Sequence, residues 1–149
     1  MKFAQFAQGQ VLTAGPAHVT EDEIVAFARA YDPQWFHTDP ERAKRSRWNG
    51  LIASGWQTCG IAMRLAVEVG LGRSETFGSP GLEYLKWLAP VRPGDALTLR
   101  AEVLDVRRSE RQPTLGIVRW RWILANQDDV PVLDLVATNF FDLAEGDAA

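Results

Sequence analysis

The sequence predicts a single α+β domain in which an antiparallel sheet curls around one long helix. Helical patterns fill the first half of the chain, and at least four strand patterns with short connections follow in the second half. Helices followed by consecutive strands are typical of an α+β domain with an antiparallel sheet. The 149 residues are enough for one domain with a proper core, but not for two.

The first predicted helix begins after Thr20. Thr20 and Glu23 have the spacing of a capping box, in which each side chain accepts from the other residue's backbone amide. Four apolar residues then recur with the spacing of one buried helix face: Ile24, Phe27, Ala28 and Tyr31. The helix is expected to end before Pro33, because proline disfavours a helical residue before it. A second short helix is predicted to begin at Asp39, with Pro40 in its first position.

A longer helix is predicted from Ile52 to Val69. Its residues are apolar on nearly every side, and the strongly polar exceptions are Gln57, Arg64 and Glu68. A helix that is apolar almost all round is one that its surroundings bury. We therefore expect it to be the central element around which the sheet is wrapped.

The second half of the chain alternates between apolar and polar residues, as half-buried strands do. Four strands are predicted: Gly81–Leu88, Leu97–Val103, Thr114–Leu124 and Val130–Phe141. In the third of these, Trp120 and Trp122 share one face and Arg119 and Arg121 share the other. The tryptophan face is expected to pack on the core or on an interface.

Charge and composition exclude several classes of function. The formal net charge of −3 argues against a nucleic-acid binder or a polybasic membrane surface. A single cysteine allows no internal disulfide, and with only two histidines beside it a closed Cys/His zinc site cannot be built. The chain has neither a secretory signal nor a run of the roughly 18 apolar residues that a membrane-spanning helix needs, so the cytoplasm is the expected location.

The segment between the first two helices holds a candidate acid/base pair. Asp32 and His37 lie five residues apart in a stretch rich in proline and aromatic residues. A carboxylate that takes a proton and an imidazole that shares or returns it near neutral pH are what such chemistry needs. The alternative is that Asp32 only ends a helix and that His37 is an ordinary surface residue.

A second candidate is Gly55, at the start of the long helix. Backbone amides there are unpaired and lie at the positive end of the helix dipole, so the Gly55 N–H has the character of an oxyanion donor. Glycine also lets a substrate carbonyl approach the main chain closely. The alternative is that Gly55 only allows the helix to pack tightly against a strand.

Taken together, these segments resemble the MaoC-like branch of the hotdog-fold hydratases and dehydratases. The matching residues are Phe27-Ala28, Asp32, His37, Asp39-Pro40, Ala43, Gly50-Leu51-Ile52-Ala53-Ser54-Gly55 and the stretch from Leu85 to Asp95. The resemblance spans residues 5–142 and leaves 143–149 as a flexible tail. It implies a single hotdog domain, a curled antiparallel sheet around a long central helix, and agrees with the α+β pattern.

The resemblance also implies a reaction. Members of this family hydrate trans-2-enoyl thioesters of coenzyme A or acyl carrier protein, or run the reverse dehydration, without a further cofactor. Asp32 and His37 would then activate the water, and the Gly55 N–H would polarise the thioester carbonyl. Trp35 and Trp56 flank these residues and, with Ser54, are the expected substrate-binding side chains; the family also implies a homodimer or higher homo-oligomer.

The sequence departs from the family pattern at a few positions. Gln34-Trp35 stands where many hydratases have Asn-Pro, and Ser54 stands where many have His. These changes concern the shape of the pocket more than the type of reaction. Two other functions stay open: an acyl-thioester hydrolase, for which Glu68 is the one carboxylate that stands out on the long helix, and a non-catalytic protein that binds an acyl thioester.

Overall fold

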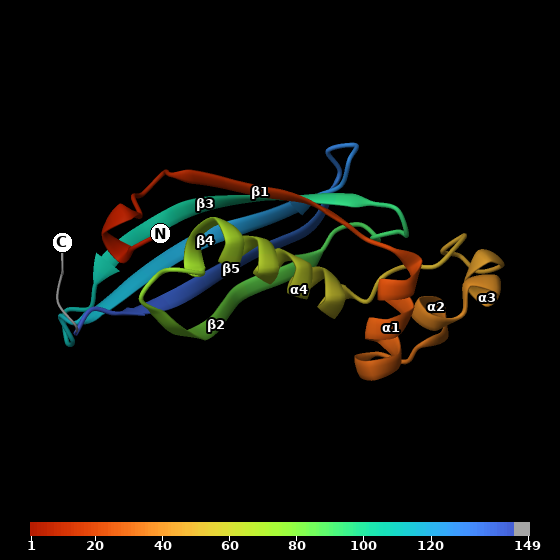
Figure 1. Cartoon of the computed structure of the whole chain (residues 1–149), viewed down its shortest axis with the longest axis horizontal. Helices are drawn as coiled ribbons and strands as arrows, with labels where there is room; N and C mark the ends of the chain where they lie inside the picture. Colours follow the sequence, from red (N-terminus) through yellow and green to blue (C-terminus); the bar gives the residue numbers. More distant parts are fainter. Residues whose placement is uncertain (145–149) are drawn as a thin grey trace.

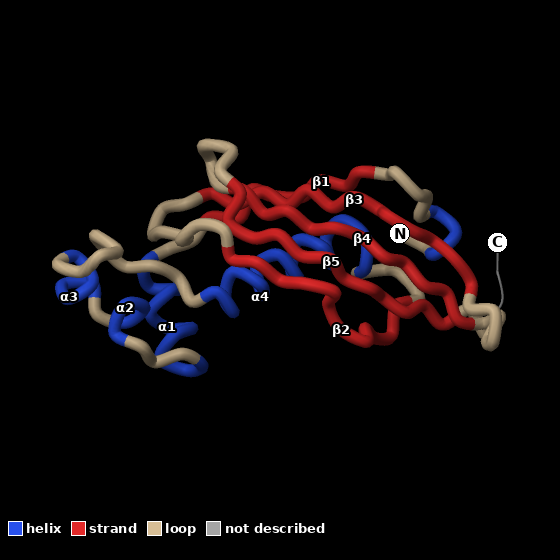
Figure 2. The backbone as a smooth tube through the Cα atoms, turned by 180° about the vertical axis from the view of Figure 1, so that it is seen from behind, coloured by secondary structure: helices blue, strands red, loops and turns tan. Residues whose placement is uncertain are grey.

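The computed structural model describes residues 1–144, in which one antiparallel sheet of five strands has the order β1-β3-β4-β5-β2 (Figures 1 and 2). The strands are β1 (Val11–His18), β2 (Thr76–Trp87), β3 (Ala96–Arg108), β4 (Leu115–Ala125) and β5 (Pro131–Asp142). Four of these strands correspond to the four predicted ones, although the predicted end residues Leu88, Thr114 and Val130 lie just outside them. The α+β class with a curled antiparallel sheet and a long helix is therefore confirmed.

Helices fill the chain between β1 and β2. They are α1 (Glu21–Tyr31), α2 (Trp35–Thr38), α3 (Pro40–Lys44), α4 (Gly55–Ala66) and the π-helical turn η2 (Val67–Leu71), and a short turn η1 (Phe3–Gln5) precedes β1. The predicted capping box of α1 is present, with Thr20 and Glu23 each accepting from the other's amide. Asp39 caps α3, as the Asp-Pro pair predicts. The first three α-helices gather beyond one end of the sheet (Figure 1).

The long helix α4 lies along the inner face of the sheet (Figure 1). Its inward side is buried and includes Thr58, Ala62 and Leu65. Its outward side is open, and the Trp56 side chain is 60% exposed. The helix is central, as predicted, but the expectation that its surroundings bury it holds only for the side that faces the sheet.

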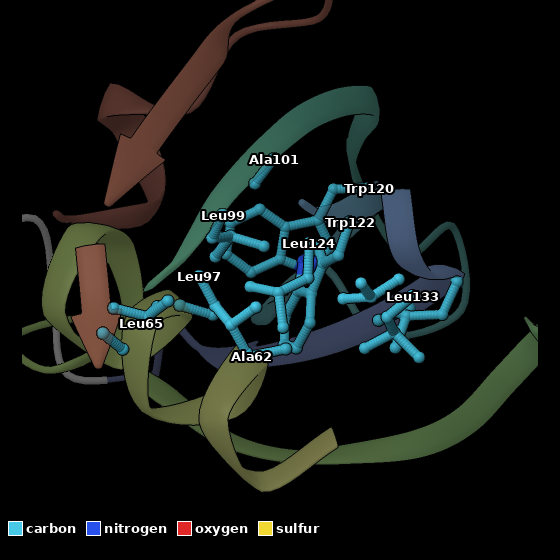
Figure 3. Close-up of a cluster of buried hydrophobic side chains, with 14 of the residues drawn as sticks. Ala62, Leu65, Leu97, Leu99, Ala101, Trp120, Trp122, Leu124 and Leu133 are labelled. Atoms are coloured by element: carbon cyan, nitrogen blue, oxygen red, sulfur yellow. The ribbon is translucent and has the colours of Figure 1, made fainter. Parts of the chain in front are cut away.

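The core lies between α4 and the inner face of the sheet (Figure 3). Alternate residues of β4 point inward, so that Trp120 and Trp122 are buried and Arg119 and Arg121 lie on the outer face. Trp120 Nε1 donates to Asn139 Oδ1 at 2.9 Å, which satisfies the indole N–H inside the core. The alternation predicted for this strand is confirmed.

Two features near the start of the chain differ from expectation. β1 was not among the predicted strands; its Gly15-Pro16 pair and the irregular register between Ala14 and Ala17 interrupt the strand pattern. Proline is tolerated there because β1 is an edge strand. Phe3, which lies before the predicted domain start at residue 5, is buried in the core. At the other end, the predicted flexible tail lies outside the described residues from residue 145 onward.

Two details of the helical segment also differ. The segment between the first two predicted helices contains the short helix α2, and Tyr31, expected on the buried face of α1, is 77% exposed. The Tyr31 ring instead packs on Phe27 at a centroid distance of 5.1 Å.

Within residues 1–144, no helix is both long and apolar enough to cross a membrane. The cytoplasmic location stays a prediction.

Candidate active site

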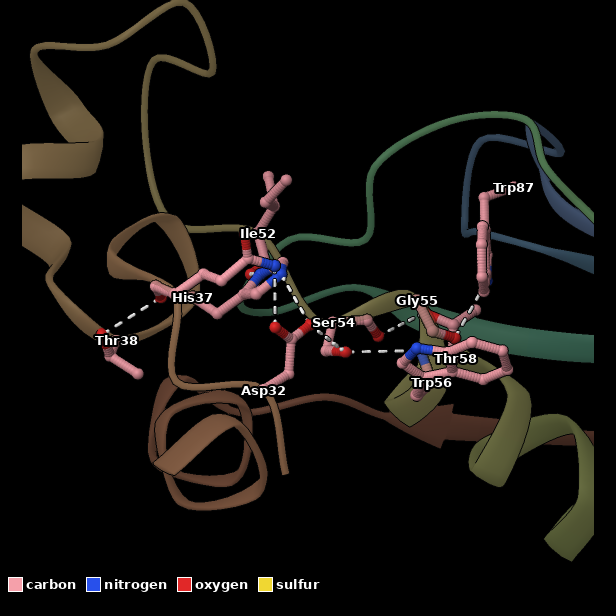
Figure 4. Close-up of polar contacts among 10 residues, drawn as sticks. Asp32, His37, Thr38, Ile52, Ser54, Gly55, Trp56, Thr58 and Trp87 are labelled. Carbon is pink, nitrogen blue, oxygen red and sulfur yellow. Dashed lines mark hydrogen bonds and ion pairs between the residues drawn. The ribbon is translucent and has the colours of Figure 1, made fainter. Parts of the chain in front are cut away.

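Asp32 and His37 meet at the point where the chain leaves α1 (Figure 4). Asp32 is the last residue of the α1 hydrogen-bond ladder, where its N–H donates to Ala28 O, and Pro33 then turns the chain into α2. His37 lies on α2, with its ring buried. His37 Nε2 is 3.2 Å from Asp32 Oδ2, so the two residues predicted from their spacing are in direct contact.

The other ring nitrogen of His37 fixes its tautomer. Nδ1 is 2.7 Å from the backbone carbonyl oxygen of Ile52, and a carbonyl oxygen can only accept a hydrogen bond. Nδ1 therefore carries a proton. In the neutral imidazole, Nε2 then presents its lone pair toward the Asp32 carboxylate, and the two acceptors can be satisfied together only by a proton between them. The pair is thus built to take up one proton from a neighbouring molecule.

Two side chains hold the Asp32 carboxylate in place. Ser54 Oγ donates to Asp32 Oδ2 at 2.7 Å, and Gln34 Nε2 donates to Oδ1 at 2.8 Å. Burial raises the pKa of the Asp32 carboxyl, but hydrogen bonds from Gln34 and Ser54, together with the positive charge that His37 carries when its ring is protonated, outweigh burial and lower the pKa below its usual value. The carboxyl is therefore ionised at neutral pH. Gln34 and Ser54 are both positions at which the sequence departs from the family pattern.

Ser54 also begins the central helix. It is fully buried, and its Oγ accepts from the Trp56 backbone N–H at 3.3 Å as the cap of α4. One hydroxyl therefore ties the first turn of α4 to the carboxylate at the end of α1. Ser54 was predicted to bind substrate; the structure places its hydroxyl on Asp32, and substrate binding at this position stays a prediction.

Gly55 follows Ser54 and lies under the indole of Trp87, at the end of β2 (Figure 4). Trp87 Nε1 donates to Gly55 O at 2.9 Å, and any side chain at Gly55 would overlap the Trp87 indole. The close packing of α4 against a strand, which was the alternative explanation of this glycine, is therefore present. Among the described residues no hydrogen-bond acceptor faces the Gly55 N–H, as befits the first residue of a helix.

The remaining predicted residues lie around this centre. The Trp56 ring packs edge-on against Trp87 at 5.1 Å between centroids. Trp35 lies on the same short helix as His37, and the guanidinium of Arg42 lies 4.4 Å from its ring centroid. Sequence reasoning missed Trp87 as part of the site, although it stands in the Leu85–Asp95 stretch that carries part of the resemblance.

Two other charged residues, Arg92 and Glu68, make contacts of their own outside the pair. Arg92 donates to Gly50 O at 3.2 Å and so supports the loop before α4. Glu68 is exposed in η2, after the far end of α4 from Ser54, and pairs with Arg64 at 3.9 Å. It is therefore not placed to attack a thioester near Gly55. Within residues 1–144, no three His, Cys, Asp or Glu side chains come together as a metal site.

Comparison with known proteins now gives the family. A model of the MaoC like domain matches residues 2–122. The chain belongs to the MaoC-like family. The protein YdeM of Bacillus subtilis is 35% identical over 134 residues, which cover 90% of this chain and 94% of YdeM.

Solved structures agree with this assignment. The MaoC-like dehydratase from Rhodospirillum rubrum has a TM-score of 0.85 and 36% identity, and the match covers 93% of this MaoC-like chain and 94% of that structure. The R-hydratase PhaJ1 from Pseudomonas aeruginosa has a TM-score of 0.75 at 22% identity, with 94% and 84% covered, and shares the fold. The predicted single hotdog domain is confirmed, and the family supports a hydratase or dehydratase in general terms.

Proposed function

We propose that this MaoC-like protein is a hydro-lyase that adds water to a 2-enoyl thioester of coenzyme A or acyl carrier protein, or runs the reverse dehydration. The observation that carries the proposal is the contact between His37 Nε2 and Asp32 Oδ2, with His37 Nδ1 held by Ile52 O. This arrangement offers one site for a proton beside a fixed carboxylate. No cofactor besides the thioester carrier is needed for this chemistry.

In the hydration direction, the oxygen of water attacks C3 and the water gives one proton to the pair. Because the pKa of Asp32 is lowered, the transferred proton resides on His37 Nε2 while Asp32 stays ionised and orients the water. The electron pair of the double bond moves to the thioester oxygen and forms an enolate. The enolate collapses when C2 takes the proton back from the pair, so that one water has been added in total.

The Gly55 N–H is the proposed donor to the enolate oxygen. It is the first amide of α4, so its proton has no partner within the helix and lies at the positive end of the helix dipole. A preorganised donor of this kind typically lowers the barrier by about 3 kcal/mol. Trp56 and Trp87, packed edge to face beside Gly55, form an apolar wall suited to an acyl chain.

A spectrophotometric assay tests this function. The protein is mixed with trans-2-enoyl-CoA substrates of short and medium length, and the loss of enoyl absorbance and the release of free thiol are followed together. Absorbance loss without thiol release is expected. Thiol release would instead indicate a hydrolase. No change in absorbance or thiol with a broad panel of acyl thioesters would favour a non-catalytic binding protein.

Variants of the pair make the assay specific. Asp32→Asn and His37→Gln are each expected to lower kcat at least about 100-fold, because general acid–base catalysis contributes that much or more. His18→Gln is the matched control, since His18 is the other histidine and lies exposed at the end of β1. Full activity in either variant of the pair would overturn the mechanism.

We also propose that two copies associate through the edge strand β2 and the open side of α4. β2 is the last strand of the sheet, so its outer backbone groups have no strand partner among the described residues. Phe77 on this strand is 62% exposed, and Met63 and Val67 extend the apolar surface along α4. A second copy would cover this surface and place its own chain near Gly55.

A further inference from the structure

A surface groove lies between α2, the short helix that carries His37, and α3, and it has no part in the chemistry described above. It has a volume of about 410 Å³ and is lined by Trp35, Arg42, Arg45 and Ser46. Trp35 and His37 belong to the same short helix, so the groove and the catalytic pair share α2 as a common wall. The volume falls in the range of about 300–1,000 Å³ that small-molecule sites occupy.

The groove is strongly positive although the whole chain is negative. Residues 42–47 contain Arg42, Lys44, Arg45 and Arg47 and no acidic residue, against a net charge of −3 for the protein. None of these four makes an ion pair with another described residue. The nearest carboxylates in sequence are those of Glu41, which makes no ion pair in the described part of the chain, and Asp39, which accepts from the Arg42 backbone N–H as the cap of α3. Four basic residues against these two acidic ones leave the segment with an excess of positive charge.

The guanidinium of Arg42 is already positioned for a ligand. It lies 4.4 Å from the centroid of the Trp35 ring, which restricts its motion. A guanidinium stacked on an aromatic face keeps its N–H donors at the edge, where they match the oxygens of a phosphate. Arg45 also lines the groove, and its one hydrogen bond to the protein runs from Nε to Glu41 O at 3.4 Å, so its terminal nitrogens have no partner among the described residues.

We propose that this groove binds the phosphate groups of the pantetheine carrier that bears the acyl substrate. The inference rests on the proposed function, because it assigns one end of the same substrate. The acyl end lies at Asp32, His37 and Gly55, and the phosphate end lies across α2 at Arg42 and Arg45. Coenzyme A and the phosphopantetheine arm of an acyl carrier protein both supply this chemistry.

Binding of the carrier without its acyl group tests the groove independently of catalysis. Isothermal titration with free coenzyme A is compared with titration with pantetheine, which lacks phosphate. Arg42→Gln and Arg45→Gln are each expected to weaken coenzyme A about 10-fold, as loss of a charged hydrogen bond does, and to leave pantetheine unchanged. Added salt should weaken coenzyme A binding to the wild type, because the groove is exposed to solvent.

Kinetics then connect the groove to the reaction. With enoyl-CoA or enoyl-acyl carrier protein, the same variants should raise KM about 10-fold and leave kcat unchanged, because neither arginine makes a hydrogen bond or ion pair with Asp32, His37 or Gly55. With an enoyl-pantetheine thioester they should behave as wild type. Arg111→Gln is the matched control, because Arg111 is an exposed arginine in the turn between β3 and β4, at the other end of the sheet.

The outcomes separate the two proposals. An effect with coenzyme A, with the carrier protein or with both supports the groove and identifies the carrier. Unchanged affinity and KM for both phosphate-bearing carriers, or an equal loss with the pantetheine compound, would overturn it. If the wild type binds coenzyme A through Arg42 and Arg45 but turns over no enoyl thioester, the function fails and the groove stands.

Discussion

Ser54 Oγ donates a 2.7 Å hydrogen bond to Asp32 Oδ2, the same carboxylate oxygen that faces His37 Nε2 at 3.2 Å. The hydroxyl belongs to the cap of α4 and the carboxylate to the end of α1. A single bond therefore couples the stability of the central helix to the charge state of the proposed catalytic pair.

Ser54→Ala should affect both properties. Removing a helix cap costs about 1 kcal/mol of unfolding free energy, and losing a donor raises the pKa of Asp32 toward its usual value. The acid limb of the kcat/KM profile is then expected to move to higher pH. Thr20→Ala, which removes the cap of α1, is the control: it should lower stability similarly and leave the pH profile unchanged.

Gly55→Ala tests the packing at the start of α4. The added methyl would overlap the Trp87 indole, and overpacking of this kind costs about 1–3 kcal/mol of unfolding free energy. Activity should fall as well, because the Gly55 N–H would be displaced. In a Trp87→Ala background, Gly55→Ala should lower the unfolding free energy much less than it does in the wild type. Denaturant unfolding measures both effects, and a single variant as stable as wild type would contradict the packing argument.

Asp134→Asn tests an ion pair on the outer face of the sheet. Arg121 donates to both Asp134 oxygens, at 3.0 and 2.7 Å, and this contact holds the pKa of Asp134 below its usual value despite partial burial. A lowered folded-state pKa gives stability that is present above the unfolded pKa and is lost as the pH falls through the folded one.

The wild type should therefore exceed Asp134→Asn by about 1 kcal/mol at pH 7, and the difference should shrink as the pH falls below about 4. Urea unfolding across this pH range provides the measurement. Asp128→Asn, in the exposed turn between β4 and β5, should show no such dependence, because Asp128 has no ion-pair partner in the described part of the chain. A difference that grows toward low pH would contradict the assignment.

Leu82→Arg tests the proposed association of two copies. Leu82 lies on the edge strand β2 and is 46% exposed, so a charge there would be buried without a partner if two β2 strands meet. Sedimentation velocity should show a dimeric wild type and a monomeric variant. Val130→Arg, which is 43% exposed in the β4–β5 turn, should stay dimeric. A wild type that sediments as a monomer would remove this proposal.

The sequence predicted those elements whose evidence is local. The capping box at Thr20, the proline that ends α1 and the alternation through Trp120 each depend on residues within one turn or one strand. The contact of Asp32 with His37 belongs to the same class, because five residues and one turn of chain bring them together. Local geometry leaves few alternatives at such short separations.

Tertiary structure determined the contacts between residues that lie far apart in the sequence. The bond from Ser54 to Asp32 spans 22 positions, the contact of His37 with Ile52 spans 15, and that of Trp87 with Gly55 spans 32. No periodicity encodes such contacts, because they arise when the sheet and α4 pack together and bring the ends of separate elements into reach. The pattern of apolar residues likewise predicted that α4 is the central helix. Which face of α4 stays exposed depends on the tertiary structure, because the sheet covers one side of this helix only.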